Sequence, residues 1–178
     1  IFKGAGSSLY GNNAMAGTIN IITKRPTQNF TGTLNLSRGT YNTKSINISG
    51  SKYIFDKLFI NLAGFYRNSD GYFDLPDSLQ DQYSVPIFLD ERGLSANIGY
   101  SFNKNAIFDI KYDYYDDKRG EGVKIYKSDG VHRNFDTNFI QATFKKKNNV
   151  SKFDIKGYIQ KEDYFRVAER FKKGDYNH

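Results

Sequence analysis

The chain has 178 residues, with 26 lysine and arginine against 19 aspartate and glutamate residues, and it contains no cysteine. Without cysteine, disulfides and thiolate metal sites are excluded, and two histidines are too few for a histidine-rich metal site. Abundant phenylalanine and tyrosine, with 16 glycines and 3 prolines, are typical of an all-β protein. No apolar run approaches the roughly 18 residues of a membrane-spanning helix, but strands crossing a membrane need apolar residues only at alternate positions.

The net charge of +7 raises the question of nucleic-acid binding. Basic residues are nevertheless scattered through the predicted strands and turns, with acidic residues interleaved in the loops. The main basic cluster, Lys145, Lys146 and Lys147, is followed by two asparagines in a predicted turn. A turn that faces water or lipid headgroups accounts for this cluster, so we predict no nucleic-acid partner.

Residues 1–26 are rich in small side chains as far as Gly17, which indicates tight turns packed against other backbone. A short β-branched strand with Ile19, Ile21 and Ile22 follows, and Pro26 ends it because proline cannot donate to a strand ladder. Ser7 and Ser8 lie in this segment without the Gly-x-Ser-x-Gly pattern of a hydrolase, and Gly4-x-Gly6 lacks the third glycine of a dinucleotide site. No enzymatic activity is predicted.

Residues 3–26 read Lys-Gly-Ala-Gly-Ser-Ser-Leu-Tyr-Gly-Asn-Asn-Ala-Met-Ala-Gly-Thr-Ile-Asn-Ile-Ile-Thr-Lys-Arg-Pro. This stretch resembles the end of the plug domain of TonB-dependent outer-membrane receptors, departing from the usual family pattern at Lys3, Ala5 and Ala16. The resemblance implies structural or gating roles in the plug for Lys3, Gly4, Gly6, Ser7, Tyr10, Gly11, Ala14, Gly17 and Asn20.

From Phe30 onwards, polar and apolar residues alternate in seven segments. We expect antiparallel strands with one wet face at 30–38, 44–53, 57–69, 91–102, 106–116, 134–146 and 150–164. The clearest segment places Leu94, Ala96, Ile98, Tyr100 and Phe102 on one face. Phe59 and Phe65 interrupt the pattern of their strand.

Two features favour a membrane barrel over a soluble β-sandwich. The expected strands are longer than the about 5–6 residues typical of soluble sheets and suit the about 9–11 tilted residues of a bilayer crossing. Long connections are expected at 70–90 and 117–133, and short turns at the opposite strand ends, as in outer-membrane barrels. Aromatic residues also gather near the strand ends, where interfacial girdles lie.

Seven strands cannot close a barrel, and a plugged lumen requires about 22 strands. The fold class predicted is therefore all-β: part of a large transmembrane antiparallel β-barrel, about seven strands long, preceded by the end of a plug domain. We expect residues 1–29 to end the plug and residues 30–178 to begin the barrel, as an internal piece of a longer protein.

The resemblance implies energised uptake of a scarce ligand: a ferric siderophore, haem, cobalamin or an oligosaccharide. It also implies three partners, namely the outer-membrane lipid of a Gram-negative bacterium, a TonB-type inner-membrane energy-coupling protein and a small-molecule or metal-chelate ligand. No cofactor is implied. Two alternatives remain open at this point: an adhesive or structural outer-membrane barrel without transport, and a soluble β-sandwich that binds carbohydrate or nucleic acid.

Ligand contacts are expected in the long loops, and the candidates are Tyr72, Phe73, Asp74, Arg119, Lys127 and His132. A calcium site formed by Asp113, Asp116, Asp117 and Asp129 is a further possibility, because oxygen-rich loops can bind Ca²⁺. A solvated loop base explains the same run of aspartates, and His132 fits a loop or rim position better than a metal site.

Overall fold

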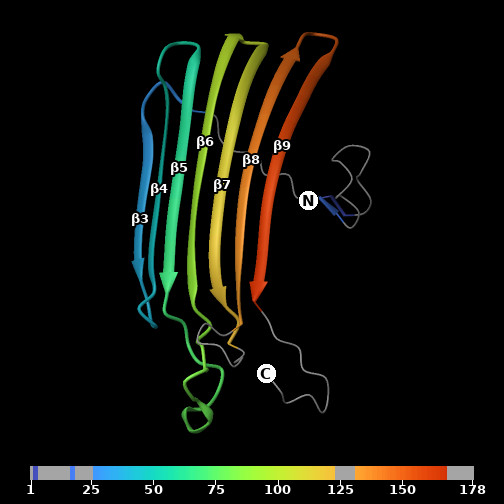
Figure 1. Ribbon diagram of the computed structural model, residues 1–178. Coiled ribbons are helices and arrows are strands. Elements are labelled where there is room, and N and C mark those ends of the chain that lie inside the picture. Colours follow the sequence, from blue (N-terminus) through green and yellow to red (C-terminus); the bar gives the residue numbers. More distant parts are fainter. Residues whose placement is uncertain (1, 4–16, 19–25, 123–130, 168–178) are drawn as a thin grey trace.

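Seven long antiparallel strands form a single sheet in the computed structural model, which describes residues 2–3, 17–18, 26–122 and 131–167 (Figure 1). The strands pair in chain order, each with the next, as an up-and-down meander. They are β3 (Thr31–Arg38), β4 (Lys44–Tyr53), β5 (Leu58–Ser69), β6 (Leu89–Asn103), β7 (Ala106–Gly120), β8 (His132–Lys147) and β9 (Lys152–Val167). A short 3₁₀ helix, η1 (Asp77–Leu79), lies in the β5–β6 loop.

The seven predicted strands are confirmed, and β4 has the predicted bounds. β6, β7 and β8 are longer than predicted at the ends that lead to the long loops. The prediction that 117–133 is one long loop is therefore wrong: β7 continues to Gly120 and β8 begins at His132. Charged residues at these positions pair across neighbouring strands, so their polarity does not end the strands.

The strand register places the alternating residues on two faces of different chemistry. Leu62, Ala96, Tyr112, Ile140 and Ile159 lie opposite one another from β5 to β9 and share what we call the apolar face. The residues between them share the polar face. The predicted alternation is thus confirmed for most of the sheet. It is least regular in β8, where Asn138 shares the apolar face with Ile140 while Phe135 and Phe139 lie on the polar face.

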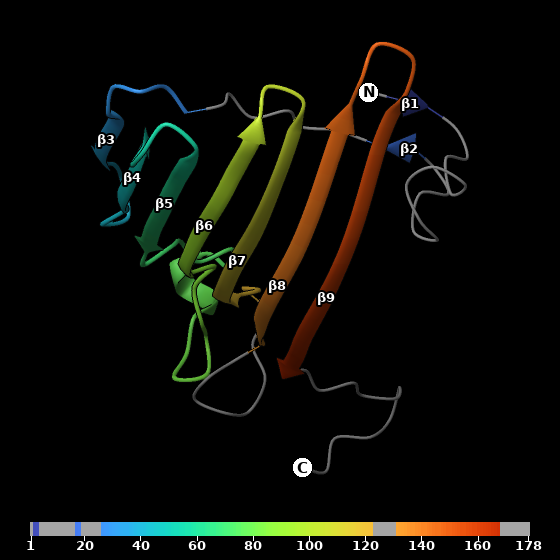
Figure 2. The same ribbon diagram turned by 90° about the horizontal axis from the view of Figure 1, so that it is seen from above.

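The sheet is twisted and curved (Figure 2), and the polar face is the hollowed one. A hollow of about 340 Å³ on this face is lined by Asn47, Ala63, Phe65, Ser95 and Asp113, among others. Side chains on a concave face crowd together, and the buried Phe59, Glu91, Asp117 and Thr143 all point to it. Most large aliphatic side chains of the strands lie instead on the apolar face, where many are exposed.

Two glycines of β6 explain why Phe59 and Phe65 stand on the polar face. Phe59 pairs with Gly99, and Phe65 pairs with Gly93. A Cβ at Gly99 would lie 2.1 Å from Cζ of Phe59, and one at Gly93 would lie 2.4 Å from Cε1 of Phe65. Each ring therefore lies over the backbone of a glycine, in the space that a larger side chain would need.

The connections fall into two classes by the end of the sheet at which they lie (Figure 1). One end, which we call the short-turn end, carries the connections 54–57, 104–105 and 148–151. The other, the long-loop end, carries 70–88 and 121–131. The β3–β4 turn also lies at the long-loop end but is short, and its Tyr41 and Asn42 have positive φ angles of 55° and 53°.

Of the segment assigned to the plug, the structure describes two short paired strands, β1 (Phe2–Lys3) and β2 (Gly17–Thr18). Lys3 and Gly17 pair with each other in this ladder. The remaining plug-motif residues, Gly4, Gly6, Ser7, Tyr10, Gly11, Ala14 and Asn20, lie outside the described residues. The division into plug and barrel stays a prediction.

Substitution of Gly99 by valine should lower the free energy of unfolding of the protein by about 1–3 kcal/mol, because the ring of Phe59 would have to leave its buried position. Urea unfolding followed by circular dichroism measures this loss. Gly157→Ala is the matched control, since nothing lies within 4 Å of a Cβ there, and its effect should stay within about 0.5 kcal/mol. Equal effects of both substitutions would contradict the packing account.

Candidate functional site

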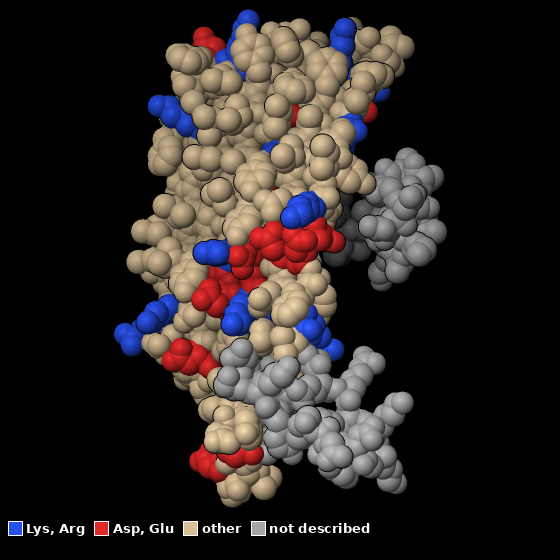
Figure 3. Space-filling model, in the orientation of Figure 1, with Lys and Arg blue, Asp and Glu red and all other residues tan. Residues whose placement is uncertain are grey.

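The apolar face carries a continuous apolar belt, in which Ile98 is 50% and Ile159 is 75% exposed. A soluble protein rarely leaves so many large apolar side chains uncovered together. Toward the long-loop end, the last belt residues on successive strands from β3 are Leu36, Ile46, Tyr66, Leu94, Tyr114, Ile140 and Ile159. The belt forms the broad uncharged area in the upper part of Figure 3.

A band of charge borders the belt on its long-loop side (Figure 3). Arg92, Asp116, Asp136 and Asp163 lie opposite one another on β6 to β9. Arg92 is 2.9 Å from Asp116, and Lys161 is 2.8 Å from Asp163. Neighbouring like charges repel, and these two ion pairs offset that repulsion at the two ends of the aspartate row.

The edge of the belt runs obliquely across the strands. Following the register from Ile159 on β9 back through the sheet leads to Gly32 on β3, four residues from the belt residue Leu36. If the strands are tilted relative to the membrane plane, a belt edge that runs parallel to this plane crosses successive strands at shifted positions in the register. Strands of membrane barrels are tilted by about 35–45°, so the offset has the form that a membrane boundary produces.

The polar face carries a cluster of charges near the long-loop end, which we call the arginine–carboxylate cluster: Arg67, Glu91, Tyr115, Asp117, Arg119 and Arg133. Its two carboxylates are buried, Glu91 at 5% and Asp117 at 3% exposed. Arg119 bridges them, with Nη2 donating to Glu91 at 2.8 Å and Nε donating to Asp117 at 2.5 Å. The Tyr115 hydroxyl lies 2.9 Å from Glu91 and 3.0 Å from Asp117.

The two outer arginines extend this cluster to neighbouring strands. Arg67 on β5 contacts Glu91 at 3.2 Å, and Arg133 on β8 lies 4.0 Å from Asp117. Three guanidinium groups thus face two carboxylates, which leaves an excess of one positive charge. The side chain of Arg67 is 50% exposed, so its remaining N–H groups can bind an oxyanion.

A stripe of aromatic rings crosses the polar face beside the cluster. Phe65 lies 6.2 Å from Tyr115, Tyr115 lies 6.0 Å from Phe135, and Phe135 lies 6.5 Å from Tyr164, measured between ring centroids. Tyr115 belongs to both groups. The polar face therefore offers flat apolar surface next to charged donors, a combination that suits a ligand with both aromatic or apolar and anionic parts.

The β5–β6 loop is a folded part of the structure and packs on the end of β7. A Cβ at Gly71 would lie 1.9 Å from the Ile87 carbonyl oxygen, and one at Gly120 would lie 2.2 Å from that of Pro86. The Gly120 N–H donates to the Phe88 carbonyl oxygen at 3.0 Å. Val85 and Val131 are buried at this contact end of the sheet, which holds the loop base in place.

The same loop is tied to the distant β3–β4 turn. Asp70 N–H donates to the Tyr41 carbonyl oxygen at 3.0 Å, and Asn42 Nδ2 donates to the Asp70 carboxylate at 3.2 Å. The rings of Tyr41 and Tyr72 are 5.7 Å apart. The loop base thus connects the β3–β4 turn with β7 at the long-loop end.

The residues predicted as ligand contacts fall into different environments. Tyr72 and Phe73 are exposed on the β5–β6 loop, as is Asp74, whose Cβ lies close to Gly122. Arg119 lies in β7 and not in a loop, held by the buried carboxylates. His132 is the first residue of β8, at the long-loop end, and is buried at 6% exposure. This contradicts the predicted loop position but not the alternative rim position. Lys127 lies outside the described residues.

The proposed calcium cluster is not assembled by the part of the chain that the structure describes. Asp113 and Asp117 point to the polar face, whereas Asp116 points to the apolar face. Successive strand residues alternate between faces, so these carboxylates cannot converge. Asp129 lies outside the described residues, and among those described no group of three metal-binding side chains occurs.

The sequence predicted two members of the cluster, Arg119 as a ligand contact and Asp117 as a calcium ligand. The other four were not predicted as site residues: Arg67, Glu91, Tyr115 and Arg133. The sequence carries a signal for them only through the register: Glu91 pairs with Arg67 on one side and with Asp117 on the other. Because a one-residue slip exchanges the faces of a strand, this juxtaposition requires the exact pairing of the strands.

The described residues also contain no helix that is long and apolar enough to span a membrane.

The fold and surfaces define an all-β protein built from a long-stranded antiparallel sheet with one extensive apolar face. Among known proteins the chain is similar to the vitamin B12 transporter BtuB of Vibrio vulnificus (strain CMCP6), with 27% identity over 116 residues. The match covers 65% of this chain and 18% of that relative's length. No protein-family model matches the chain.

Glu91→Gln should lower the free energy of unfolding by about 1–3 kcal/mol, because it leaves Arg67 and Arg119 facing a neutral amide. The loss stays below the about 3–5 kcal/mol of a fully buried pair since both arginines are partly exposed. Urea unfolding measures it. Lys161→Gln, which breaks an exposed pair, should produce no measurable change. Wild-type stability of Glu91→Gln would rule out an organising role for the cluster.

Proposed function

We propose that this chain belongs to a TonB-dependent outer-membrane receptor that takes up a scarce ligand. In this proposal residues 30–178 form the first part of a large transmembrane β-barrel and residues 1–29 the end of its plug. The apolar face contacts outer-membrane lipid, the polar face lines the lumen, and the long-loop end faces outward from the cell. Residues 1–29 then enter at the short-turn end, on the periplasmic side.

The apolar belt with its oblique edge is the observation that carries the membrane assignment. A soluble sandwich would need a second sheet to cover this face, whereas lipid covers it without further protein. The charged band on one side of the belt and the lysines on the other mark the two boundaries. The short turns and long loops at opposite ends agree with barrel architecture.

The plug motif distinguishes a receptor from a barrel without transport. Its resemblance to plug domains covers residues 3–26, and the similarity to a protein named as a vitamin B12 transporter agrees with transport and with a non-enzymatic role.

Three buried oxygen atoms of the polar face have no hydrogen-bond partner among the described residues: Asn97 Oδ1, Asp117 Oδ1 and Thr137 Oγ1. A plug or ligand lying against this face could supply the missing donors.

We infer that ligand contact is shared between the loop and the wall. The exposed Tyr72, Phe73 and Asp74 are placed to meet a ligand first, and Arg67 with the aromatic stripe would receive it deeper in the lumen. Arg119 serves to hold the carboxylates, and His132 supports the loop base from its buried position. Cobalamin is the first ligand to test because of the relative's name, followed by haem, ferric siderophores and oligosaccharides.

The membrane assignment predicts different outcomes for lysine on the two faces of the sheet. Ile98→Lys on β6 places a charge on the apolar face in the middle of the belt and should destabilise the folded protein in lipid vesicles by about 2–4 kcal/mol. Gln160→Lys, on the polar face of β9, should change stability by less than about 0.5 kcal/mol. Unfolding in vesicles by urea tests both. If the sheet were soluble, Ile98→Lys would be harmless, because this side chain is already 50% exposed.

Transport is tested in cells that express the complete protein. Labelled cyanocobalamin, haemin, ferric siderophores and maltodextrins are offered separately, with and without the TonB-type protein and with a protonophore. We expect one class of ligand to accumulate only in energised cells that contain the coupling protein. Surface binding that is insensitive to both treatments for every ligand would favour an adhesive or structural barrel.

A further inference from the structure

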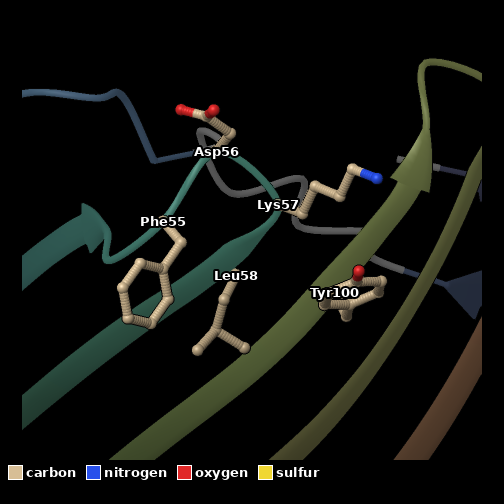
Figure 4. Close-up of a pocket in the computed structure, with 5 residues that line it drawn as sticks. All are labelled: Phe55, Asp56, Lys57, Leu58 and Tyr100. Carbon is tan, nitrogen blue, oxygen red and sulfur yellow. The ribbon is translucent and has the colours of Figure 1, made fainter.

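A hollow of about 400 Å³ opens at the β4–β5 turn, at the short-turn edge of the apolar belt. It is lined by Phe55, Asp56, Lys57, Leu58 and Tyr100 (Figure 4). Phe55 is 70% and Tyr100 is 39% exposed, and Leu58 pairs with Tyr100 across β5 and β6. The hollow therefore has an apolar floor that continues into the belt and a lysine at its rim.

The rim around this hollow differs from the opposite edge in how its charges are balanced. Its lysines are exposed and have no ion pair among the described residues: Lys52, Lys57, Lys104, Lys146, Lys147 and Lys152. At the long-loop edge, basic residues lie beside the row of aspartates on β7 to β9, and Arg92 and Lys161 are paired with two of these aspartates. The short-turn edge thus presents uncompensated positive charge next to apolar surface.

We propose that this hollow binds an anionic glycerophospholipid of the membrane leaflet that meets the short turns, an inference that rests on the membrane function proposed above. The lipid phosphate contacts the ammonium group of Lys57, and Lys104 on the neighbouring β6–β7 turn adds to the attraction. The first methylenes of the acyl chains lie along Leu58 and Tyr100. A cation near an anionic membrane surface contributes about 1 kcal/mol.

The surroundings of Lys57 favour an anionic over a zwitterionic headgroup. Asp56 is the single acidic residue among those that line the hollow, and its carboxylate points away from Phe55 and Leu58 (Figure 4). The nearby Tyr100, Phe102 and Phe144 form a chain of ring contacts, with centroids 5.0 and 6.5 Å apart. Aromatic rings of this kind occupy the headgroup depth of a bilayer, which sets the lysines at the level of the phosphates.

Native mass spectrometry of the complete protein tests the proposal, in micelles containing equal amounts of dioleoyl phosphatidylglycerol and dioleoyl phosphatidylcholine. We expect the parent protein to retain several-fold more phosphatidylglycerol. The K57Q/K104Q variant should lose this enrichment and retain the two lipids about equally, because each lysine contributes up to about 1 kcal/mol, a factor of about five. K57R/K104R should keep it, because the charges remain.

The matched control is K44Q/K118Q, which removes two exposed lysines of the long-loop end and should leave the enrichment unchanged. Added sodium chloride should weaken the preference of the parent protein, since it screens exposed charges. Equal retention of both lipids by the parent, or full enrichment in K57Q/K104Q, would overturn the inference. Because ligand uptake is measured separately, intact uptake without lipid preference would overturn this inference alone.

Discussion

Backbone pairing between successive strands is the constraint on which the rest of the structure depends. From β3 to β9 each strand pairs with the next, with one register irregularity at the β6–β7 turn. Since side chains alternate with a period of two, this register sorts every residue onto one of two faces. The apolar belt, the aspartate row and the arginine–carboxylate cluster all follow from it, because each consists of residues brought level on different strands.

The two faces satisfy their side chains in different ways. On the polar face, curvature brings side chains together, so that Arg119 can bridge two buried carboxylates and Phe59 can cover Gly99. On the apolar face, large aliphatic side chains such as Leu94, Ile98 and Ile159 stay exposed, which is favourable where hydrocarbon replaces water. The same sheet therefore carries closely packed, hydrogen-bonded side chains on one face and exposed apolar side chains on the other.

Strand number, order and facing could be predicted from the sequence, because alternation such as that of Leu94 to Phe102 is a local property. The ends of β7 and β8 could not, since the charged residues at Asp117 and Arg133 look like loop residues until their partners across the sheet are known. The facing of Phe65 could not be explained from the sequence for the same reason. The residue that makes room for its ring, Gly93, is 28 residues away and comes to lie opposite Phe65 only when β5 pairs with β6. Loop conformation and the cluster depend on such long-range placement.

The anchoring of the β5–β6 loop bears on how such a protein could change its specificity. The loop base is fixed to the β3–β4 turn through Asp70 and to β7 through Gly120, while residues nearer its tip, such as Leu79, are 59% exposed. Insertions or replacements at the tip can therefore accumulate without disturbing the wall beneath. Sequence changes can therefore reshape the exposed part of this loop while the hydrogen bonds at its base still join the β3–β4 turn to β7.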